Sequence, residues 1–455
     1  MVKDCYEYKS KLIFYKMKLK PISGFSMFVI LLVVNAIFLF PTVSAKAKPK
    51  TKPIVLARDS ASAHASLSEM QLGFFAHYSF PGKKYQWRST GWIDGSEIKS
   101  LDELADNFDA TDLVEKAATM RAQYLIFTTS HANMNVLFPS EVMKQYLPGH
   151  CSKRDVLADL IKAAKKKNIR VLFYVHPSDG HDFTKEDQDR VGYNEGAPFK
   201  KYNDFINAYY AELVDRYGKD VTGYFLDGGV PKKILDLPRL RKTFLSRQPG
   251  ALLIQNGGLN RTCNDYGAFE TLDPPYPAAN WVVCKPITGE WWALKNSVII
   301  CPELAYRYTV LQASVRDRQG GGVNWAFGPY PGGKWEVGVP SFCERLGKLI
   351  DKSGPSVLGT HPGKAWVTLN NQPLVGLAYT ATESVDGKTT YLHQFLPPKK
   401  QQLELPAPTD GRKFSSARLL VNHHKVDLKQ TDKSVILTLN ANDRWDDVDT
   451  IIELN

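Results

Sequence analysis

Runs of hydrophobic residues alternate along the chain with stretches in which apolar and polar positions repeat at helical spacing. Unbroken apolar runs of this length are typical of parallel strands that are buried on both faces. The first five runs are Gly73–Phe80, Gln123–Thr129, Ile169–Val175, Thr222–Gly228 and Ala251–Asn256.

Helical patterns fill the intervals between these runs. In RDVLADLIKAAKKK (Arg154–Lys167), the apolar residues share one face and the lysines lie on the other. TDLVEKAATM predicts a second helix, capped by Thr111 or Asp112. YNDFINAYYAELVDRYG predicts a third, which ends on Gly218 in a left-handed conformation.

Three later runs complete a set of about eight strands between Gly73 and Phe327; they are Asn280–Ile287, Ser297–Cys301 and Gly321–Pro329. The predicted fold is therefore α/β, a (β/α)8-type barrel. An open doubly wound sheet is the alternative, although no GxGxxG follows the first strand. Residues 257–279 show no helical period, so we expect a long loop in place of one barrel helix.

The pattern changes after Gly354-Pro355, where short alternating strands and turns replace the helices. This predicts a small C-terminal antiparallel β-sandwich, with VDGK (Val385–Lys388) as a type I′ hairpin turn. The expected organisation is a signal peptide or anchor (1–45), a basic linker (46–62), a catalytic (β/α)8-like barrel (63–355) and the sandwich (356–455).

The N-terminus accounts for most of the positive charge. The formal net charge is +11, and residues 1–58 supply +9 of it, from eleven Lys and Arg less Asp4 and Glu7. The remaining chain is near neutral, so we expect no nucleic-acid partner. Three lysines precede the apolar run Met27–Phe40, and Ala45 follows it, which predicts a cleaved signal peptide and a secreted, lysosomal or extracellular protein. An uncleaved membrane anchor is the alternative.

Secretion would permit one or two disulfides and glycosylation of the sequon at Asn260. The cysteines are widely spaced and contain no CxxC pair, so they predict neither a disulfide scaffold nor a zinc site.

Polar residues gather where the predicted strands end, which is the face that carries the active site of a (β/α)8 barrel. These residues are His77, Thr129, Ser130, His131, Tyr174, His176, Asp227 and Asn256. A glycosidase needs a second carboxylate beside Asp227. The candidates for it are Asp265, Glu270, Asp273 and Glu290.

A metal-dependent barrel hydrolase is the competing hypothesis. The HPSDGHD stretch offers His176, Asp179, His181 and Asp182, which are residue types that can bind zinc. A solvated polar turn is the favoured interpretation of this stretch, so we expect no metal and no cofactor.

Six stretches resemble glycoside hydrolase family 29, the α-L-fucosidases, in order and approximate spacing between Leu72 and Pro329. They are LGFFAHYSF, NFDATDLVEKAATMRAQYLIFTTSHANMNVLFPSE, KRDVLADLIKAAKKKNIRVLFYV, GYFLDGG, NDYGAFET and GGVNWAFGP. The family's small C-terminal domain agrees with the predicted sandwich. The resemblance implies a retaining exo-glycosidase that removes terminal α-L-fucose from glycans or glycoconjugates.

The resemblance also implies a role for individual residues. Asp227 matches the catalytic nucleophile, and Glu270, in the loop after the fifth strand, matches the acid/base. His77, His131 and Tyr174 match side chains that bind the sugar hydroxyls. We expect the glycines after Asp227 to leave room for the sugar. A fucosylated glycan is the expected partner, a membrane partner is expected only if the N-terminus stays uncleaved, and a homo-oligomer is compatible with the sequence.

Three departures from the family pattern keep a second hypothesis open. Ala132 and Asn133 replace a His and an Asp, Gly258 stands in place of an arginine, and Val282 replaces a glutamate. A catalytically impaired fucose-binding relative is therefore the alternative to an efficient enzyme.

Overall fold

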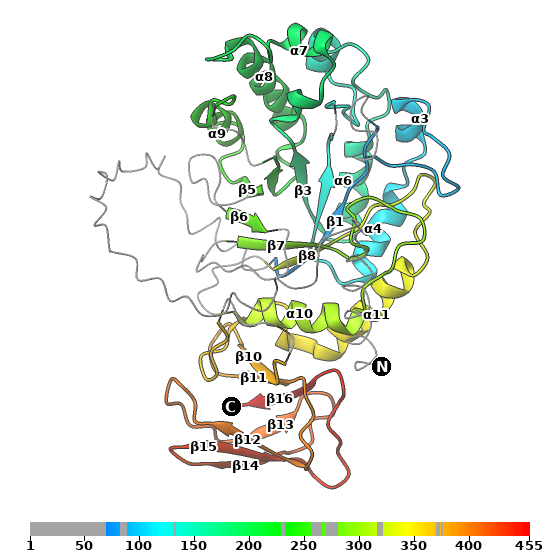
Figure 1. Cartoon of the computed structure of the whole chain (residues 1–455). Coiled ribbons are helices and arrows are strands. Elements are labelled where there is room, and N and C mark those ends of the chain that lie inside the picture. Colours follow the sequence, from blue (N-terminus) through cyan, green and yellow to red (C-terminus); the bar gives the residue numbers. More distant parts are fainter. Residues whose placement is uncertain are drawn as a thin grey trace, which may run out of the picture. The chain divides into compact units, whose positions relative to one another are not determined.

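Eight parallel strands form a closed barrel in the computed structural model of the chain (Figure 1). The structure describes residues 70–81, 89–131, 133–228, 233–256, 266–269, 281–315, 322–369, 374 and 376–455. Each strand pairs with the next in sequence, and β1 pairs with β8 to close the barrel. The strands are β1 (Leu72–Ala76), β2 (Tyr124–Thr128), β3 (Arg170–Val175), β4 (Gly223–Leu226), β5 (Leu252–Asn256), β6 (Tyr266–Phe269), β7 (Trp281–Pro286) and β8 (Val323–Ala326).

The strand count is confirmed, but the assignment of one strand was wrong. Residues 297–301 form no strand, and Val298 is 48% exposed. The sixth strand is Tyr266–Phe269, inside the stretch that was expected to be only a loop. It pairs with β5 through Asn256 and Ala268, and Ala268 is fully buried. Four residues rich in Gly and Ala carry little of the periodicity that identifies a strand in sequence.

Helices cover the outside of the barrel. They are α3 (Leu101–Asp106), α4 (Ala110–Thr119), α5 (Glu141–Tyr146), α6 (Val156–Lys166), α7 (Lys185–Val191), α8 (Lys200–Tyr217), α9 (Leu237–Leu245), α10 (Pro302–Ser314) and α11 (Val339–Ser353). The predicted apolar face of α6 is buried. Two predicted helix ends were wrong: Asp109, not Thr111 or Asp112, caps α4, and Gly218 is right-handed, with φ −59°.

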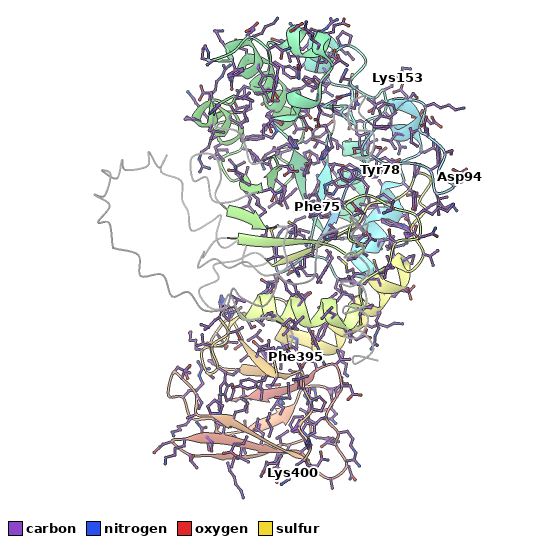
Figure 2. The ribbon with its side chains drawn as sticks, in the orientation of Figure 1. Phe75, Tyr78, Asp94, Lys153, Phe395 and Lys400 are labelled. Atoms are coloured by element: carbon purple, nitrogen blue, oxygen red, sulfur yellow. The ribbon has the colours of Figure 1, made fainter. Side chains whose placement is uncertain are left out.

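Alternate side chains of each strand point into the barrel, because successive residues of a strand face opposite sides. Phe75, Leu172, Tyr174 and Phe225 belong to this inner cluster, which is separate from the larger core between strands and helices. Figure 2 labels Phe75 inside the barrel. The residues two positions further along these strands point in the same direction and lie at the barrel mouth.

The C-terminal region contains two antiparallel sheets around a core of their own, as predicted. One sheet has the order β13-β16-β11-β10-β9 and the other β12-β15-β14. Their strands are β9 (His361–Pro362), β10 (Tyr379–Glu383), β11 (Thr390–Gln394), β12 (Gln402–Pro406), β13 (Ala417–Leu419), β14 (Asp427–Gln430), β15 (Ser434–Thr438) and β16 (Thr450–Leu454).

The hairpin predicted at Val385–Lys388 joins β10 and β11, but its turn is not type I′. Within this turn only Gly387 has a positive φ, of 72°, whereas type I′ needs positive φ at both central residues. The amide of Gly387 donates to the carbonyl of Ser384, so Gly387 lies one position later than a type I′ turn would place it.

Arg307 of α10 joins the barrel to the sandwich. Arg307 is 2% exposed, and its guanidinium donates to the carbonyl oxygens of Phe395 (2.7 Å), Asp447 (2.6 Å) and Val448 (2.8 Å). Phe395, labelled in Figure 2, directly follows β11. The charge is therefore buried against backbone acceptors of the second domain.

None of the helices that the structure describes combines the length and hydrophobicity needed to cross a bilayer. The predicted signal or anchor segment, the linker and Asn260 lie outside the described residues. Cys301 is disulfide-bonded, whereas Cys151, Cys284 and Cys343 form no disulfide.

Candidate active site

Asp227 lies at the mouth of the barrel, immediately after β4. Its inward direction follows from Phe225, two residues earlier, which points into the barrel. The carboxylate accepts hydrogen bonds from the Tyr174 hydroxyl on Oδ2 (2.5 Å) and from the Asn256 amide on Oδ1 (2.7 Å). The backbone amide of Gly228 also donates to Oδ1 (2.7 Å). Three donors from three strand ends therefore hold the carboxylate in place.

These contacts keep Asp227 ionised. Burial raises the pKa of the Asp227 carboxyl, but the electrostatic effect of His176 and the hydrogen bonds from Tyr174, Asn256 and Gly228 outweigh burial. The net result lowers the pKa of Asp227 from 3.8 to about 2. A half-buried carboxylate that is charged at neutral pH is suited to act as a nucleophile or as a ligand for a cation.

His77 lies beside this carboxylate and is neutral. Burial lowers its pKa from 6.5 to about 3, against the opposing charge of Asp227. Its ring centroid is 5.3 Å from that of Tyr174 and 4.9 Å from that of Trp292. Nδ1 of His77 is buried and has no hydrogen-bond partner among the described residues. A buried polar atom without a partner is costly, and the hydroxyl group of a ligand could pair with it.

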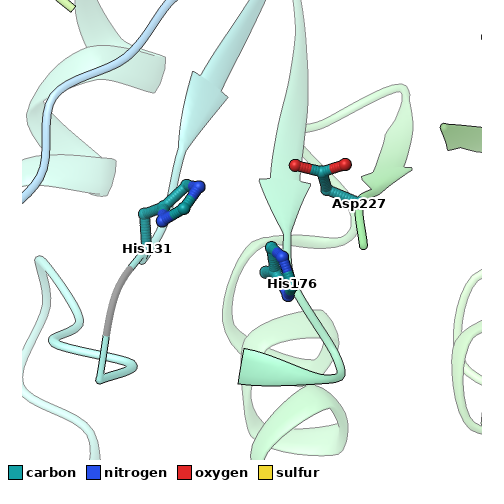
Figure 3. Close-up of side chains that lie close together, drawn as sticks. All are labelled: His131, His176 and Asp227. Atoms are coloured by element: carbon teal, nitrogen blue, oxygen red, sulfur yellow. The ribbon is translucent and has the colours of Figure 1, made fainter. Parts of the chain in front are cut away.

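Two further histidines flank Asp227 (Figure 3). The rings of His131 and Tyr174 stack, with centroids 5.6 Å apart. His176 follows β3, and its Nδ1 lies 3.1 Å from Oδ1 of Asp179, which is fully buried. One ligating atom each of His131, His176 and Asp227 lies within 4.8 Å of the others.

The sequence of the chain matches the family model described as Alpha-L-fucosidase over residues 41–303, which is more than half of its 455 residues. The chain belongs to the alpha-L-fucosidase family. The members of this family are glycoside hydrolases, which agrees with the carboxylate at the barrel mouth. No curated protein sequence matches the chain.

Solved structures of fucosidases share the fold. An α-L-fucosidase from Paenibacillus thiaminolyticus is 18% identical, with 87% of this chain and 99% of that chain covered and a TM-score of 0.65. The Bacteroides thetaiotaomicron enzyme is 18% identical, with 91% of this chain and 98% of that chain covered and a TM-score of 0.63. The Thermotoga maritima enzyme in complex with fucose is 15% identical, with 86% of this chain and 98% of that chain covered and a TM-score of 0.61.

Four of the five residues that the fucosidase resemblance singled out are brought together. His77, His131, Tyr174 and Asp227 come from the ends of β1, β2, β3 and β4. The catalytic and sugar-binding roles of the four stay predictions. Glu270 lies outside the described residues, as do Asp265, Asp273 and Arg261. Glu270 directly follows β6 in sequence, not the fifth strand as predicted.

Three residues at the mouth of this fucosidase barrel were given no role in a fucosidase site from the sequence. Asn256 was recognised only as a strand-end polar residue, and Trp292 was not considered. His176 was recognised as a strand-end residue and as a zinc ligand of the competing hypothesis. The Trp292 ring lies 5.0 Å from that of His131, and its Nε1 donates to Ser79 Oγ. The alternation along β3 could have identified His176, because it has the same parity as the inward-facing Tyr174.

The interpretation of HPSDGHD as a solvated turn was wrong. His176 is 5% exposed, Asp179 is 0% exposed and Asp182 is 1% exposed. The segment forms a short 3-10 helix over Asp179–Asp182. The side chain of His181 is not among those that the structure describes.

Gly228, which follows Asp227, was expected to leave room for the sugar, and the structure gives it a different role. Gly228 has φ +83°, and a Cβ there would lie 2.4 Å from Cε1 of His176 and 2.6 Å from Oγ of Ser178. The absent side chain therefore makes room for His176 rather than for a sugar. Gly229 lies outside the described residues.

Trp291 belongs to the barrel mouth, whereas Trp92 and Trp325 belong to the outer core. Trp291 lies 5.3 Å from the His77 ring, at the site. Trp325 is 2% exposed and donates to Thr309 Oγ1, and Trp92 packs against the outer core. Trp87 lies outside the described residues. Val282, in place of the family's glutamate, is fully buried in β7 and offers the site no carboxylate.

Proposed function

We propose that the protein is a retaining exo-α-L-fucosidase that hydrolyses terminal fucose of glycans or glycoconjugates. The observation that carries this proposal is the half-buried, ionised carboxylate of Asp227. It is held by Tyr174 and Asn256 at the mouth of a fucosidase-family barrel.

In the first step, an oxygen of Asp227 attacks the anomeric carbon of fucose. A glycosyl ester forms, the bond from the anomeric carbon to the leaving oxygen breaks, and protonated Glu270 gives its proton to that oxygen. In the second step, ionised Glu270 takes a proton from water, which attacks the same carbon and releases Asp227. Two inversions retain the configuration. A covalent intermediate trapped in the Bacteroides thetaiotaomicron enzyme with 2-fluoro-fucosyl fluoride supports this route.

His77, His131 and Tyr174 would bind the sugar hydroxyls. A neutral His77 has one ring nitrogen that donates and one that accepts, so it can pair with a hydroxyl without carrying charge. Tyr174 would both orient Asp227 and face the sugar.

An aryl α-L-fucoside assay tests this proposal. We expect turnover by the wild type, a loss of more than about 1,000-fold in Asp227→Ala and Glu270→Ala, and partial rescue of one or both by azide. Asp94→Ala, which removes an exposed carboxylate at the outer edge of the molecule (Figure 2), is the control. NMR of the first-formed sugar should show the α-anomer. Full activity of Asp227→Ala would refute the assignment of the nucleophile.

An impaired fucose-binding relative is the second candidate, and the buried Val282 in place of a glutamate favours it. Binding of fucose by an inert wild type, measured by calorimetry, would establish this alternative.

A further inference from the structure

Two buried histidines and one half-buried carboxylate, all with metal-ligating atoms, converge at the barrel mouth. They are His131, His176 and Asp227, from the ends of β2, β3 and β4, and Figure 3 shows them around one space. No other cluster of three or more potential ligands occurs in the part of the chain that the structure describes. We propose that these three side chains bind a divalent transition-metal ion, with Zn²⁺ as the representative.

The ligand set suits such an ion. Two imidazole nitrogens and one carboxylate oxygen are ligands of Zn²⁺ and of related first-row ions. With metal–ligand bonds of about 2.1 Å, two ligands in a tetrahedral site lie about 3.4 Å apart. The three atoms lie within 4.8 Å of one another, so rotation of side chains by small amounts could bring them to one ion.

A buried carboxylate supports one ligand from behind. Nδ1 of His176 lies 3.1 Å from Oδ1 of Asp179, so Nε2 is the atom that binds the ion in this proposal. Nε2 lies on the side of Gly228, where a Cβ would approach it to 2.9 Å. Histidines that bind metals commonly pair their second nitrogen with a carboxylate in this way. The resemblance to fucosidases assigns no role to either His176 or Asp179.

Asp227 retains the capacity to bind an ion. A carboxylate has about four lone-pair sites, and Tyr174, Asn256 and Gly228 use three of them. The remaining site is on Oδ2, which accepts only from Tyr174 among these three donors. An ion there would hold the carboxylate that the proposed function uses as nucleophile. The ion would then inhibit hydrolysis by competing with the fucoside, and this consequence alone rests on the proposed function.

Direct metal binding tests the site without any substrate. The full chain, produced without a histidine tag and freed of metal with EDTA, is titrated with ZnCl₂ by calorimetry and with CoCl₂ by visible absorption. We expect one ion per chain and cobalt bands typical of low coordination. His131→Ala and His176→Ala should each weaken binding more than about tenfold, and Asp179→Asn should weaken it about 10–100-fold.

His424→Ala is the matched control, because His424 also pairs with a carboxylate, Asp443, at 2.8 Å, but on the sandwich. Thermal unfolding of each variant shows whether it is folded, and Asp179→Asn preserves the shape of the side chain it replaces. Absence of binding to the wild type, or unchanged binding in the folded His131 and His176 variants, would overturn the proposal.

The two proposals fail in different ways. Zinc binding by a wild type that does not hydrolyse fucosides in EDTA would support the metal site and refute the proposed function. Hydrolysis in EDTA that Zn²⁺ does not inhibit, with no heat of binding, would refute the metal site and support the proposed function.

Discussion

The hydroxyl of Tyr174 donates to Oδ2 of Asp227 across 2.5 Å. These residues are 53 positions apart in sequence and lie at the ends of adjacent parallel strands. Tyr174 also stacks on His131, so one side chain orients the carboxylate and supports the wall of the site. Hydrogen bonds to a charged acceptor are stronger than those between neutral groups, which makes this contact a direct target for mutation.

Tyr174→Phe should lower kcat/KM for an aryl fucoside by about 10–100-fold, because a hydrogen bond to a charged group contributes about 1.5–3 kcal/mol. Loss of the donor should also raise the pKa of Asp227 and move the acid limb of the pH profile upward. Tyr78→Phe is the control, since the Tyr78 hydroxyl donates to the carbonyl of Leu104 in the outer core. An acid limb that stays in place would contradict the role given to Tyr174.

His77 should make the fold sensitive to acid. The pKa of His77 is lowered by burial from 6.5 to about 3, so below pH 6.5 the unfolded chain binds a proton that the folded chain does not. Stability therefore falls as the pH falls from 6.5 towards 3, by about 2 kcal/mol at pH 5. Urea unfolding of wild type and His77→Gln at pH 8 and pH 5 measures this. The wild type should lose about 2 kcal/mol more than the variant, and equal losses would disprove the prediction.

Arg307→Met should destabilise the protein by about 3 kcal/mol, because it leaves one buried and two part-buried carbonyl oxygens without their donor. Urea unfolding measures the change. Arg239→Met removes a half-exposed ion pair with Asp204 and should cost less than about 1 kcal/mol. If the two variants lose equal stability, the buried contacts to the sandwich are not what Arg307 contributes.

We propose that the protein is secreted after cleavage following Ala45. Expression of the full chain in eukaryotic cells should release a product that begins at Lys46, and N-terminal sequencing identifies it. Replacing Leu31 and Leu32 by Arg should interrupt the apolar run and keep the protein inside the cell. A chain that stays with the membrane fraction after carbonate extraction would favour the anchor instead.

Much of the barrel could be predicted from local pattern. Seven of the eight strands coincide with apolar runs, because strands buried on both faces need apolar residues at every position. The eighth, β6, has only four residues and a glycine, so its pairing with β5 and β7 comes from barrel closure rather than from its own sequence. The Ser297–Cys301 run is apolar for a different reason: Ile299 and Ile300 pack against the outer core, although the run forms no strand.

The sequence by itself determined which residues point inward, since alternation along a strand directs His77, Tyr174 and Asp227 to the side of Phe75, Leu172 and Phe225. Only the tertiary structure decided how these ends combine. Closure of the barrel brings His131, His176 and Asp227 within 4.8 Å, and the 3-10 turn places buried Asp179 behind His176. Such distances depend on the curvature of the whole barrel and on the path of one short turn, neither of which is encoded in a local pattern.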